Sequence, residues 1–260
     1  MSSETDIMEV HHHPHVEKKN FKEYFLEFLM IFFAVTMGFI AENLREHIKN
    51  NEEIHQDIQS VLADLESDVT HFNAALDING YGYRVADSLV SLLHNDISNT
   101  PQIYFCARAV TSNVGFFYTN SKTFDLMKTS GNLKLISPRS LLDSLGLYYV
   151  TFQLLAKQDE FVELKNDAVA KVNPLLFDSY VFSQMKVGYN STNRSHTIVY
   201  PPSGHPALLS TDYKTVNTVA LSYYYLGASE KFDCIAAERQ KQLAIRLIAL
   251  IKKEYHLQNQ

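Results

Sequence analysis

The chain has 260 residues, of which 46% are hydrophobic and 20% charged, so it is neither a disordered polyelectrolyte nor a protein with many membrane spans. Its formal net charge of −6 argues against general nucleic-acid binding, which requires clustered lysine and arginine. The two cysteines, Cys106 and Cys234, lie far apart and form no CxxC pair, which excludes a zinc knuckle and a thioredoxin-like motif.

Residues 1–23 form a polar segment without a periodic apolar pattern, and we predict a short disordered tail. The tail contains four histidines, whose imidazoles are good ligands for divalent metals: His11, His12, His13 and His15. A structural metal site also needs Cys or carboxylate partners and a second shell that fixes the rings. A polar tail near anionic headgroups is therefore the favoured interpretation, and no metal or other cofactor is predicted.

Residues 24–41 (YFLEFLMIFFAVTMGFIA) form an apolar run of 18 residues with one charge, Glu27. As a helix this run is about 27 Å long, close to the ~30 Å of the bilayer core. A cleaved signal peptide ending at Ala41 would need a small residue where Phe39 stands, and an interfacial helix would need a polar face. The run therefore predicts a transmembrane anchor, represented by Phe25, Leu29, Ala34, Gly38 and Phe39.

The charges that flank the apolar run predict the topology of the protein, and two small residues within the run suggest a partner. Three lysines (18, 19 and 22) precede the run, against Arg45 and Lys49 after it, so the positive-inside rule places the N-terminus in the cytoplasm. The pair Ala34-x-x-x-Gly38 has the small-xxx-small spacing that lets two spans approach closely. We therefore expect the lipid bilayer as a partner, and a homodimer through the span and the helix that follows it.

After the span, apolar residues recur with alternating steps of four and three, which predicts a long stalk helix with a heptad seam. The seam consists of Leu44, Ile48, Ile58, Leu62, Leu65, Val69, Phe72 and Leu76. Its partner is left open between another helix of the same chain and a second copy. We predict that Gly80 and Gly82 end this helix and that a second helix covers 85–94.

The remaining elements are expected to be helices separated by irregular loops. Residues 95–120 read as a loop with short pieces of structure, and 121–127 as a capped short helix that stops at Gly131. A long helix begins at Pro138 and ends before Pro174. Its predicted buried face is Leu141, Leu145, Tyr148, Phe152, Leu155 and Val162.

The last third of the chain combines an irregular segment with a final helix. Residues 178–209 alternate weakly around GYNSTNR, which suggests a hairpin or an inserted loop. Residues 212–257 predict a long helix with a candidate break at Gly227 and a buried stripe of Phe232, Ile235, Leu243, Leu247 and Leu250. The fold class is mainly α: a disordered tail (1–23), a transmembrane helix (24–41) and a helical extramembrane domain (42–260), built as an antiparallel bundle with irregular loops.

Candidate chemistry is sparse. Asp64, Asp68 and His71 imitate half of a di-iron site on a bundle helix, but no other segment supplies the second half, so a solvated face is the preferred interpretation. The sequence has no GxSxG, no P-loop and no GxGxxG after a strand. No catalytic residue is assigned. In an oxidising compartment Cys106 and Cys234 would be either bridged or both buried.

Several segments carry a resemblance. They are FKEYFLEFLMIFFAVTMGFIAENLREHI (21–48), preceded by EVHHHPHVEKKN; FDLMKTSGNLKLI (124–136), followed by LLDSLGLYYV (141–150); and LIALIKKEYHL (247–257). Together they resemble a family of uncharacterised single-pass membrane proteins of Gram-negative bacteria. The resemblance implies a membrane protein of unknown function, and it brings no catalytic residues with it.

The sequence leaves two functional hypotheses. The favoured one is a non-enzymatic protein of the inner membrane, with a periplasmic helical domain that acts as a scaffold or sensing module and binds an unknown protein partner. The alternative is a membrane-tethered enzyme whose site is built on loops 95–120 and 178–209. A deep polar pocket between those loops, with a shifted carboxylate or histidine, would favour the enzyme. An exposed apolar strip would favour the interaction module.

Overall fold

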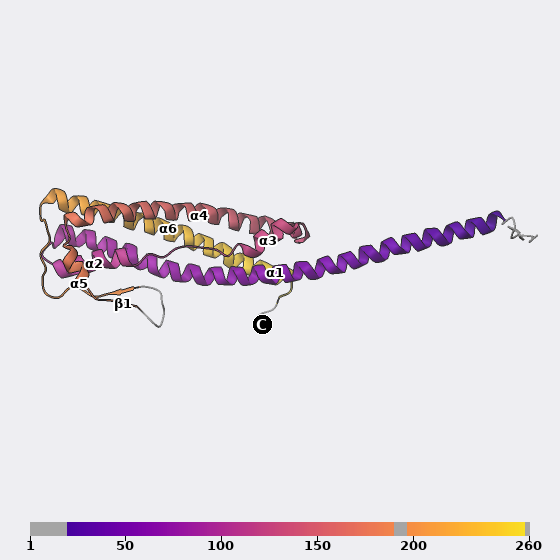
Figure 1. Ribbon diagram of the computed structural model, residues 1–260, viewed down its shortest axis with the longest axis horizontal. Coiled ribbons are helices and arrows are strands. Elements are labelled where there is room, and N and C mark those ends of the chain that lie inside the picture. The colour runs from indigo at the N-terminus through magenta and orange to yellow at the C-terminus, as the bar shows by residue number, and fades with distance from the viewer. Residues whose placement is uncertain (1–19, 190–196, 258–260) are drawn as a thin grey trace, which may run out of the picture. The chain divides into compact units, whose positions relative to one another are not determined.

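The computed structural model describes residues 20–189 and 197–257, and the chain divides into two units, 1–52 and 53–260. Helices dominate, so the predicted mainly α fold class is confirmed (Figure 1). The helices are α1 (Phe21–Asn95), α2 (Thr100–Ser112), α3 (Lys122–Ser130), α4 (Arg139–Val172), α5 (Ser179–Gln184) and α6 (Tyr213–Glu254), with 3-10 turns η1 (Asn132–Leu135) and η2 (Asn173–Leu175). The two strands are β1 (Val187–Tyr189) and β2 (Thr197–Val199).

The first unit contains the N-terminal part of α1. Its most apolar 18-residue window has a mean hydropathy of 2.0, and none of that window is buried. Large side chains such as Phe28, Phe33 and Phe39 are more than half exposed. Among the described residues, α1 is the one helix that is long and apolar enough to cross a membrane. The predicted continuous apolar helix is present.

The core of the second unit lies between the later part of α1, α4 and α6, which run alongside one another (Figure 1). Residues 54–65 of α1 pack against the start of α4 and the end of α6, whereas residues 85–93 pack against the end of α4 and the start of α6. Helix α4 therefore runs in the same direction as α1, and α6 runs against both. The predicted antiparallel arrangement holds for α6, but α4 is parallel to α1 because residues 96–138 return the chain to the starting end.

The heptad spacing predicted for α1 is present in the second unit, but half of its positions are shifted by one residue. The buried positions are Ile54, Ile58, Val61, Leu65, Asp68, Phe72, Ala75 and Asn79. The predicted Leu62, Val69 and Leu76 are instead half-buried. The shift arises because the buried positions include small and polar residues, which a search for large apolar side chains passes over. The partners of this seam are helices of the same chain.

The predicted helix end at Gly80 and Gly82 is wrong, because α1 continues to Asn95. A glycine inside a helix costs roughly 1 kcal/mol relative to alanine, but here tertiary contacts compensate for it. A Cβ on Gly82 would lie 2.9 Å from Glu230 Oε2, and a Cβ on Gly227 would lie 3.0 Å from Ala86 Cβ. Both glycines allow α1 and α6 to approach closely, so α6 also continues unbroken through Gly227.

The connection between α1 and α4 is more helical than predicted. Residues 100–112 form α2, with Pro101 in its first turn, where the missing N–H costs nothing. The short helix predicted at 121–127 is confirmed as α3, which ends at Gly131 in the left-handed conformation (φ 80°). The long helix predicted from Pro138 is confirmed as α4.

The hairpin predicted within 178–209 is present as the antiparallel pair β1–β2, in which Val187 pairs with Val199. Asn113 fixes it to the end of α2: the Thr197 N–H donates to Asn113 Oδ1 at 2.6 Å, and Asn113 Nδ2 donates to the Thr197 carbonyl at 3.2 Å. The two regions that the sequence marked as irregular therefore contact each other.

Candidate functional site

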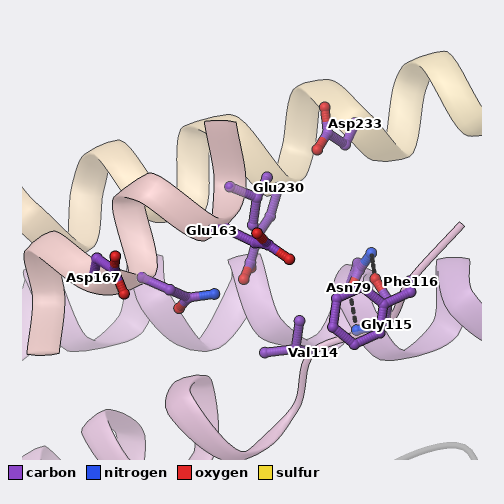
Figure 2. A pocket seen from close by; sticks show the side chains of 10 residues that line it. Asn79, Val114, Gly115, Phe116, Glu163, Asp167, Glu230 and Asp233 are labelled. Carbon is purple, nitrogen blue, oxygen red and sulfur yellow. Dashed lines mark hydrogen bonds between the residues drawn. The ribbon is translucent and has the colours of Figure 1, made fainter. Parts of the chain in front are cut away.

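An acidic cavity of about 310 Å³ lies in the second unit, between α1, α4, α6 and the extended residues 114–116 (Figure 2). Its lining combines four carboxylates, two amides and a small apolar wall. The lining residues are Asn79, Val114, Gly115, Phe116, Val162, Glu163, Asn166, Asp167, Glu230 and Asp233. No Lys, Arg or His is among these described lining residues. The cavity therefore concentrates acidic groups at one place in the bundle.

Two hydrogen bonds fasten the wall formed by residues 114–116 to α1. Asn79 Nδ2 donates to the Gly115 carbonyl at 2.9 Å, and the Gly115 N–H donates to Asn79 Oδ1 at 2.7 Å (Figure 2). A Cβ on Gly115 would lie 2.9 Å from Asn79 Oδ1 and 3.0 Å from the Ala75 carbonyl oxygen. Only glycine fits this close approach, so Asn79 and Gly115 together fix the shape of the cavity.

Glu230 is the most unusual group in the cavity. It extends from α6 toward α1 (Figure 2), is only 2% exposed, and its Oε2 has no hydrogen-bond partner among the described residues. Leaving a buried carboxylate oxygen unpaired costs free energy. The glycine at position 82 leaves room for this carboxylate where it lies, because a Cβ there would be 2.9 Å from Oε2 and the Glu230 side chain would have to shift. The packing of α1 against α6 thus accommodates the Glu230 carboxylate without giving Oε2 a hydrogen-bond donor among the described residues.

Burial raises the pKa of Glu230 from its ordinary value of 4.5 to about 8, and the nearby charge of Asp233 adds to the shift. Asp233 is itself buried, one turn further along α6. Glu163 and Asp167, one turn apart on α4, are exposed at the cavity. At neutral pH Glu230 therefore holds a proton that a cationic partner could displace.

A second cavity, of about 490 Å³, lies where the sequence placed the hypothetical enzyme site, between α2, the end of α4 and the segment around α5. Apolar and polar residues line it in equal number: Arg108, Thr111, Ala170, Asn173, Pro174, Phe177, Asp178, Ser179, Phe182 and Leu209. Asp178 is occupied as the N-cap of α5, where it accepts the Tyr180 N–H at 2.8 Å. Thr111 Oγ1 donates to the Ala107 carbonyl at 3.1 Å, within its own helix.

Asp68 corrects the prediction that Asp64, Asp68 and His71 form a solvated face. Asp68 is fully buried and accepts hydrogen bonds from Tyr148 Oη at 2.8 Å and from the Asn120 N–H at 2.7 Å. Desolvation raises its pKa, and these hydrogen bonds oppose the rise. The carboxylate occupies a seam position of α1, and for this reason it points into the bundle.

The two neighbours of Asp68 are half-buried and also engaged. Asp64 accepts hydrogen bonds from Asn120 Nδ2 and Thr123 Oγ1, and the ring of His71 lies 4.3 Å from that of Tyr118. Among the described residues, no three His, Cys, Asp or Glu side chains are placed to hold a metal ion. The cluster binds the returning segment to α1 through these hydrogen bonds.

The other predicted positions fall into two groups. The histidines His11, His12, His13 and His15 lie outside the described residues. Of the anchor positions, Phe25, Ala34, Gly38 and Phe39 are exposed in the first unit, and Leu29 is half-buried.

The two cysteines are both free thiols, which answers the question of a bridge that the sequence left open. Cys106 is buried and Cys234 half-buried. Desolvation raises the pKa of Cys106 to about 11 and that of Cys234 to about 12. Both thiols are therefore protonated and unreactive at neutral pH.

Sequence reasoning missed Glu230 and Asp233 because it placed the middle of the buried stripe of α6 on the wrong face, although Leu247, nearer the end of the helix, is buried as predicted. The predicted Phe232 and Ile235 are 59% and 47% exposed. The buried face instead follows Leu226, Gly227, Glu230, Asp233, Ala237 and Gln240. The sequence signal for this buried face was its helical spacing, which includes two acids. Acidic residues are ordinarily expected to face solvent, so that spacing was passed over.

Comparisons with protein-family profiles, with curated proteins and with solved structures find no match for this chain.

Proposed function

We propose that this chain is a single-pass membrane protein whose helical unit acts by binding other molecules rather than by catalysis. The apolar, unburied window of α1 supports the membrane anchor, since a helix that is apolar on every face is stable only in an apolar environment. The observation that carries the binding role is an apolar surface on the outside of α4 and α6.

The α4 part of this surface is a stripe of five large apolar side chains that are 54–62% exposed: Leu147, Val150, Leu154, Phe161 and Leu164. Their spacings of three, four and seven residues place them on one face of the helix. The opposite face of α4 holds the buried Leu141, Leu145 and Tyr148. Helix α4 is thus apolar on two faces, and only one of them is used inside the unit.

Helix α6 has exposed apolar residues of its own. Its exposed apolar residues are Leu221, Tyr224, Tyr225, Phe232 and Ile235. The two helices pack against each other along their length, with Thr151 Oγ1 donating to Gln240 Oε1 at 2.8 Å and Lys165 Nζ 5.6 Å from the ring centroid of Tyr225. Exposed apolar side chains that gather on a helix face are typical of interaction sites. We call these ten residues the outer apolar surface.

The occupant that we propose for the outer apolar surface is a second copy of this chain. A surface made of matching stripes on two packed helices can pair with itself about a two-fold axis. Anchoring in one bilayer raises the effective concentration of copies. The small pair Ala34 and Gly38, exposed in the first unit, offers a further contact between spans.

The test is the mass of the full-length protein in detergent or nanodiscs, measured by light scattering. Leu154→Glu places a charge in the outer apolar surface, whereas Gln153→Glu places the same charge on the neighbouring exposed position. We expect a dimer for the wild type and for Gln153→Glu, and a monomer for Leu154→Glu. A monomeric wild type, or an equal effect of the two variants, would contradict self-association.

The proposed orientation places the N-terminus in the cytoplasm and the helical unit in the periplasm of a Gram-negative cell, at the inner membrane. It rests on the lysines before the span. A protease added to cells with a permeabilised outer membrane should digest the helical unit and spare an N-terminal tag. Digestion of the tag alone would reverse the orientation.

The alternative of a membrane-tethered enzyme on loops 95–120 and 178–209 receives less support. The cavity between these loops is lined equally by apolar and polar residues. The carboxylate with a strongly shifted pKa lies in the acidic cavity, which residues 114–116 line but no described residue of 178–209 does. The exposed apolar strip that favours the interaction module is present on α4 and α6.

A further inference from the structure

The acidic cavity contains a buried group that the fold leaves unsatisfied and that the interaction role does not use. Glu230 Oε2 has no hydrogen-bond partner in the described part of the chain, although the side chain is almost completely removed from solvent. Buried polar atoms are normally paired, so an unpaired one in a cavity points to a missing partner. A donor supplied by a bound molecule would complete the pairing.

The charges around Glu230 define what such a donor must be. Asp233 on α6 and Glu163 and Asp167 on α4 are the titratable groups that line the cavity with it, while α1 contributes Asn79 and residues 114–116 contribute no ionisable side chain. Arg84, Lys231 and Arg239 on α1 and α6 line a separate cavity. Lys165 on α4 places its Nζ 5.6 Å from the ring centroid of Tyr225. An anion would meet four carboxyl groups without a compensating charge, so the charges of the cavity favour a cationic partner.

We propose that the acidic cavity binds a small organic cation, a protonated primary amine on an apolar body, whose ammonium group donates a hydrogen bond to Glu230 Oε2.

The lining favours an organic cation over a metal ion. The lining also includes the apolar side chains Val114, Phe116 and Val162, which would cover the body of an amine but cannot ligate a metal. The described residues contain no group of three or more potential ligands placed for a metal ion. Phe116 is 58% exposed, so its ring remains accessible to a cation, an arrangement that aromatic rings favour. A cavity of about 310 Å³ accommodates a molecule the size of benzylamine.

Binding must be linked to proton release. In the empty cavity Glu230, with a pKa of about 8, is protonated at pH 7. An ammonium ion pairs with the carboxylate form, so the proton of Glu230 leaves to solvent when the amine binds. Below pH 8 the affinity should therefore rise by up to about tenfold per pH unit, and it should level off above pH 8.

The experiment is calorimetric titration of benzylamine into the full-length protein in detergent, at pH 6, 7 and 8. Benzyl alcohol is the matched neutral probe, because it has nearly the same shape and no charge. We expect heat of binding for benzylamine only, an affinity that rises with pH, and release of one proton, measured in buffers of different ionisation enthalpy.

Two variants sharpen the test. Glu230→Gln keeps the shape of the side chain and removes its negative charge, so we expect at least about a tenfold loss of affinity for benzylamine. Glu238→Gln, two turns further along α6, lies outside the cavity and should leave binding unchanged. Benzylamine partitions into detergent equally in the wild-type and variant samples, so this contribution cancels when their binding is compared. If Glu230→Gln does not fold, the pH dependence of the wild type decides the question.

Several outcomes would overturn the proposal: equal binding of benzyl alcohol, an affinity that does not change between pH 6 and 8, or full affinity in Glu230→Gln. Displacement of benzylamine by millimolar MgCl₂ would assign the cavity to a metal ion instead. The proposal is independent of self-association through the outer apolar surface. If the protein dimerises but does not bind amines, the proposed function is supported and the cation site is rejected. If it binds amines but stays monomeric, the cation site is supported and self-association is rejected.

Discussion

Helix α1 is continuous, but its apolar side chains are exposed in its first part and buried along one seam in its second part. Before residue 53 the large apolar side chains, such as Phe32 and Phe33, are 51% and 57% exposed. After it, Ile58, Leu65 and Phe72 are at most 1% exposed. Residues 24–41 of the first part are apolar around the helix, whereas the second part has one apolar seam surrounded by acids and amides. The arrangement of the apolar residues around the helix, more than their number, separates a bilayer anchor from a bundle helix.

The largest effect that follows from this comparison concerns location. Deleting residues 25–41 should move the protein from the carbonate-washed membrane pellet to the soluble fraction, because it removes the apolar window of α1. The second unit should still unfold cooperatively, since its core lies within residues 54–251. Replacing the same segment with leucines should keep the protein in the membrane. A full-length wild type that is soluble without detergent would contradict the anchor.

The second prediction compares three leucines on the same helix. Leu65 is fully buried, and Leu65→Ala should lower the free energy of unfolding by about 2–5 kcal/mol. Leu62 is half-buried, and its replacement should cost less than that of Leu65. Leu44→Ala, in the first unit, should leave the unfolding of the second unit unchanged. Denaturant titrations followed by circular dichroism measure all three. An equal loss at Leu62 and Leu65 would favour the seam predicted from the sequence over the one in the structure.

Periodicity predicted the long helices correctly, because large apolar residues at every third or fourth position fall on one face of a helix but on both faces of a strand. It failed at Gly82 and Gly227, where the sequence alone cannot tell a helix end from a close approach between helices. It also failed at Asp68, because a carboxylate on a seam is buried only when Tyr148 and Asn120 come from distant parts of the chain to pair with it.

The candidate site was less predictable for the same physical reason. Glu230 becomes distinctive only through what surrounds it: the absence of a side chain at Gly82, the charge of Asp233, and a wall held by Asn79. None of these neighbours is close in sequence except Asp233. The helical spacing of Leu226, Glu230 and Asp233 indicates that the three side chains lie on one face of α6. The general rule that acids face solvent argued against burying that face.

The third prediction tests the buried carboxylate of the α1 seam. Asp68→Ala leaves the Tyr148 hydroxyl and the Asn120 N–H without their acceptor in a buried position, which should cost about 1–3 kcal/mol of unfolding free energy. Asp143→Ala is the matched control, because Asp143 is exposed on α4 and its ion pair with Arg139 is exposed as well. That change should stay within about 0.5 kcal/mol. Similar losses for both variants would indicate that Asp68 is solvated, as the sequence suggested.

The last prediction concerns pH and the second buried carboxylate. The pKa of Glu230 in the folded state is raised to about 8, against 4.5 for an ordinary glutamate, so between these values the folded protein binds a proton that the unfolded chain has lost. The contribution of Glu230 to stability is therefore fully present below pH 4.5 and is lost as the pH rises toward 8. From pH 6 to pH 7 the free energy of unfolding should fall by about 1.4 kcal/mol.

Glu230→Gln stays neutral at every pH and should remove this slope, becoming steadily more stable than the wild type as the pH rises. Burial also raises the pKa of Asp68, which gives a contribution of the same sign that the variant retains. Glu238→Gln is the control: Lys241 and Gln242 lower the pKa of Glu238, so its contribution is lost only in acid and the slope between pH 6 and 7 should persist. A wild type with constant stability over this range would mean that Glu230 is already paired or solvated. In that case the acidic cavity would have no unsatisfied carboxyl group to offer a cation.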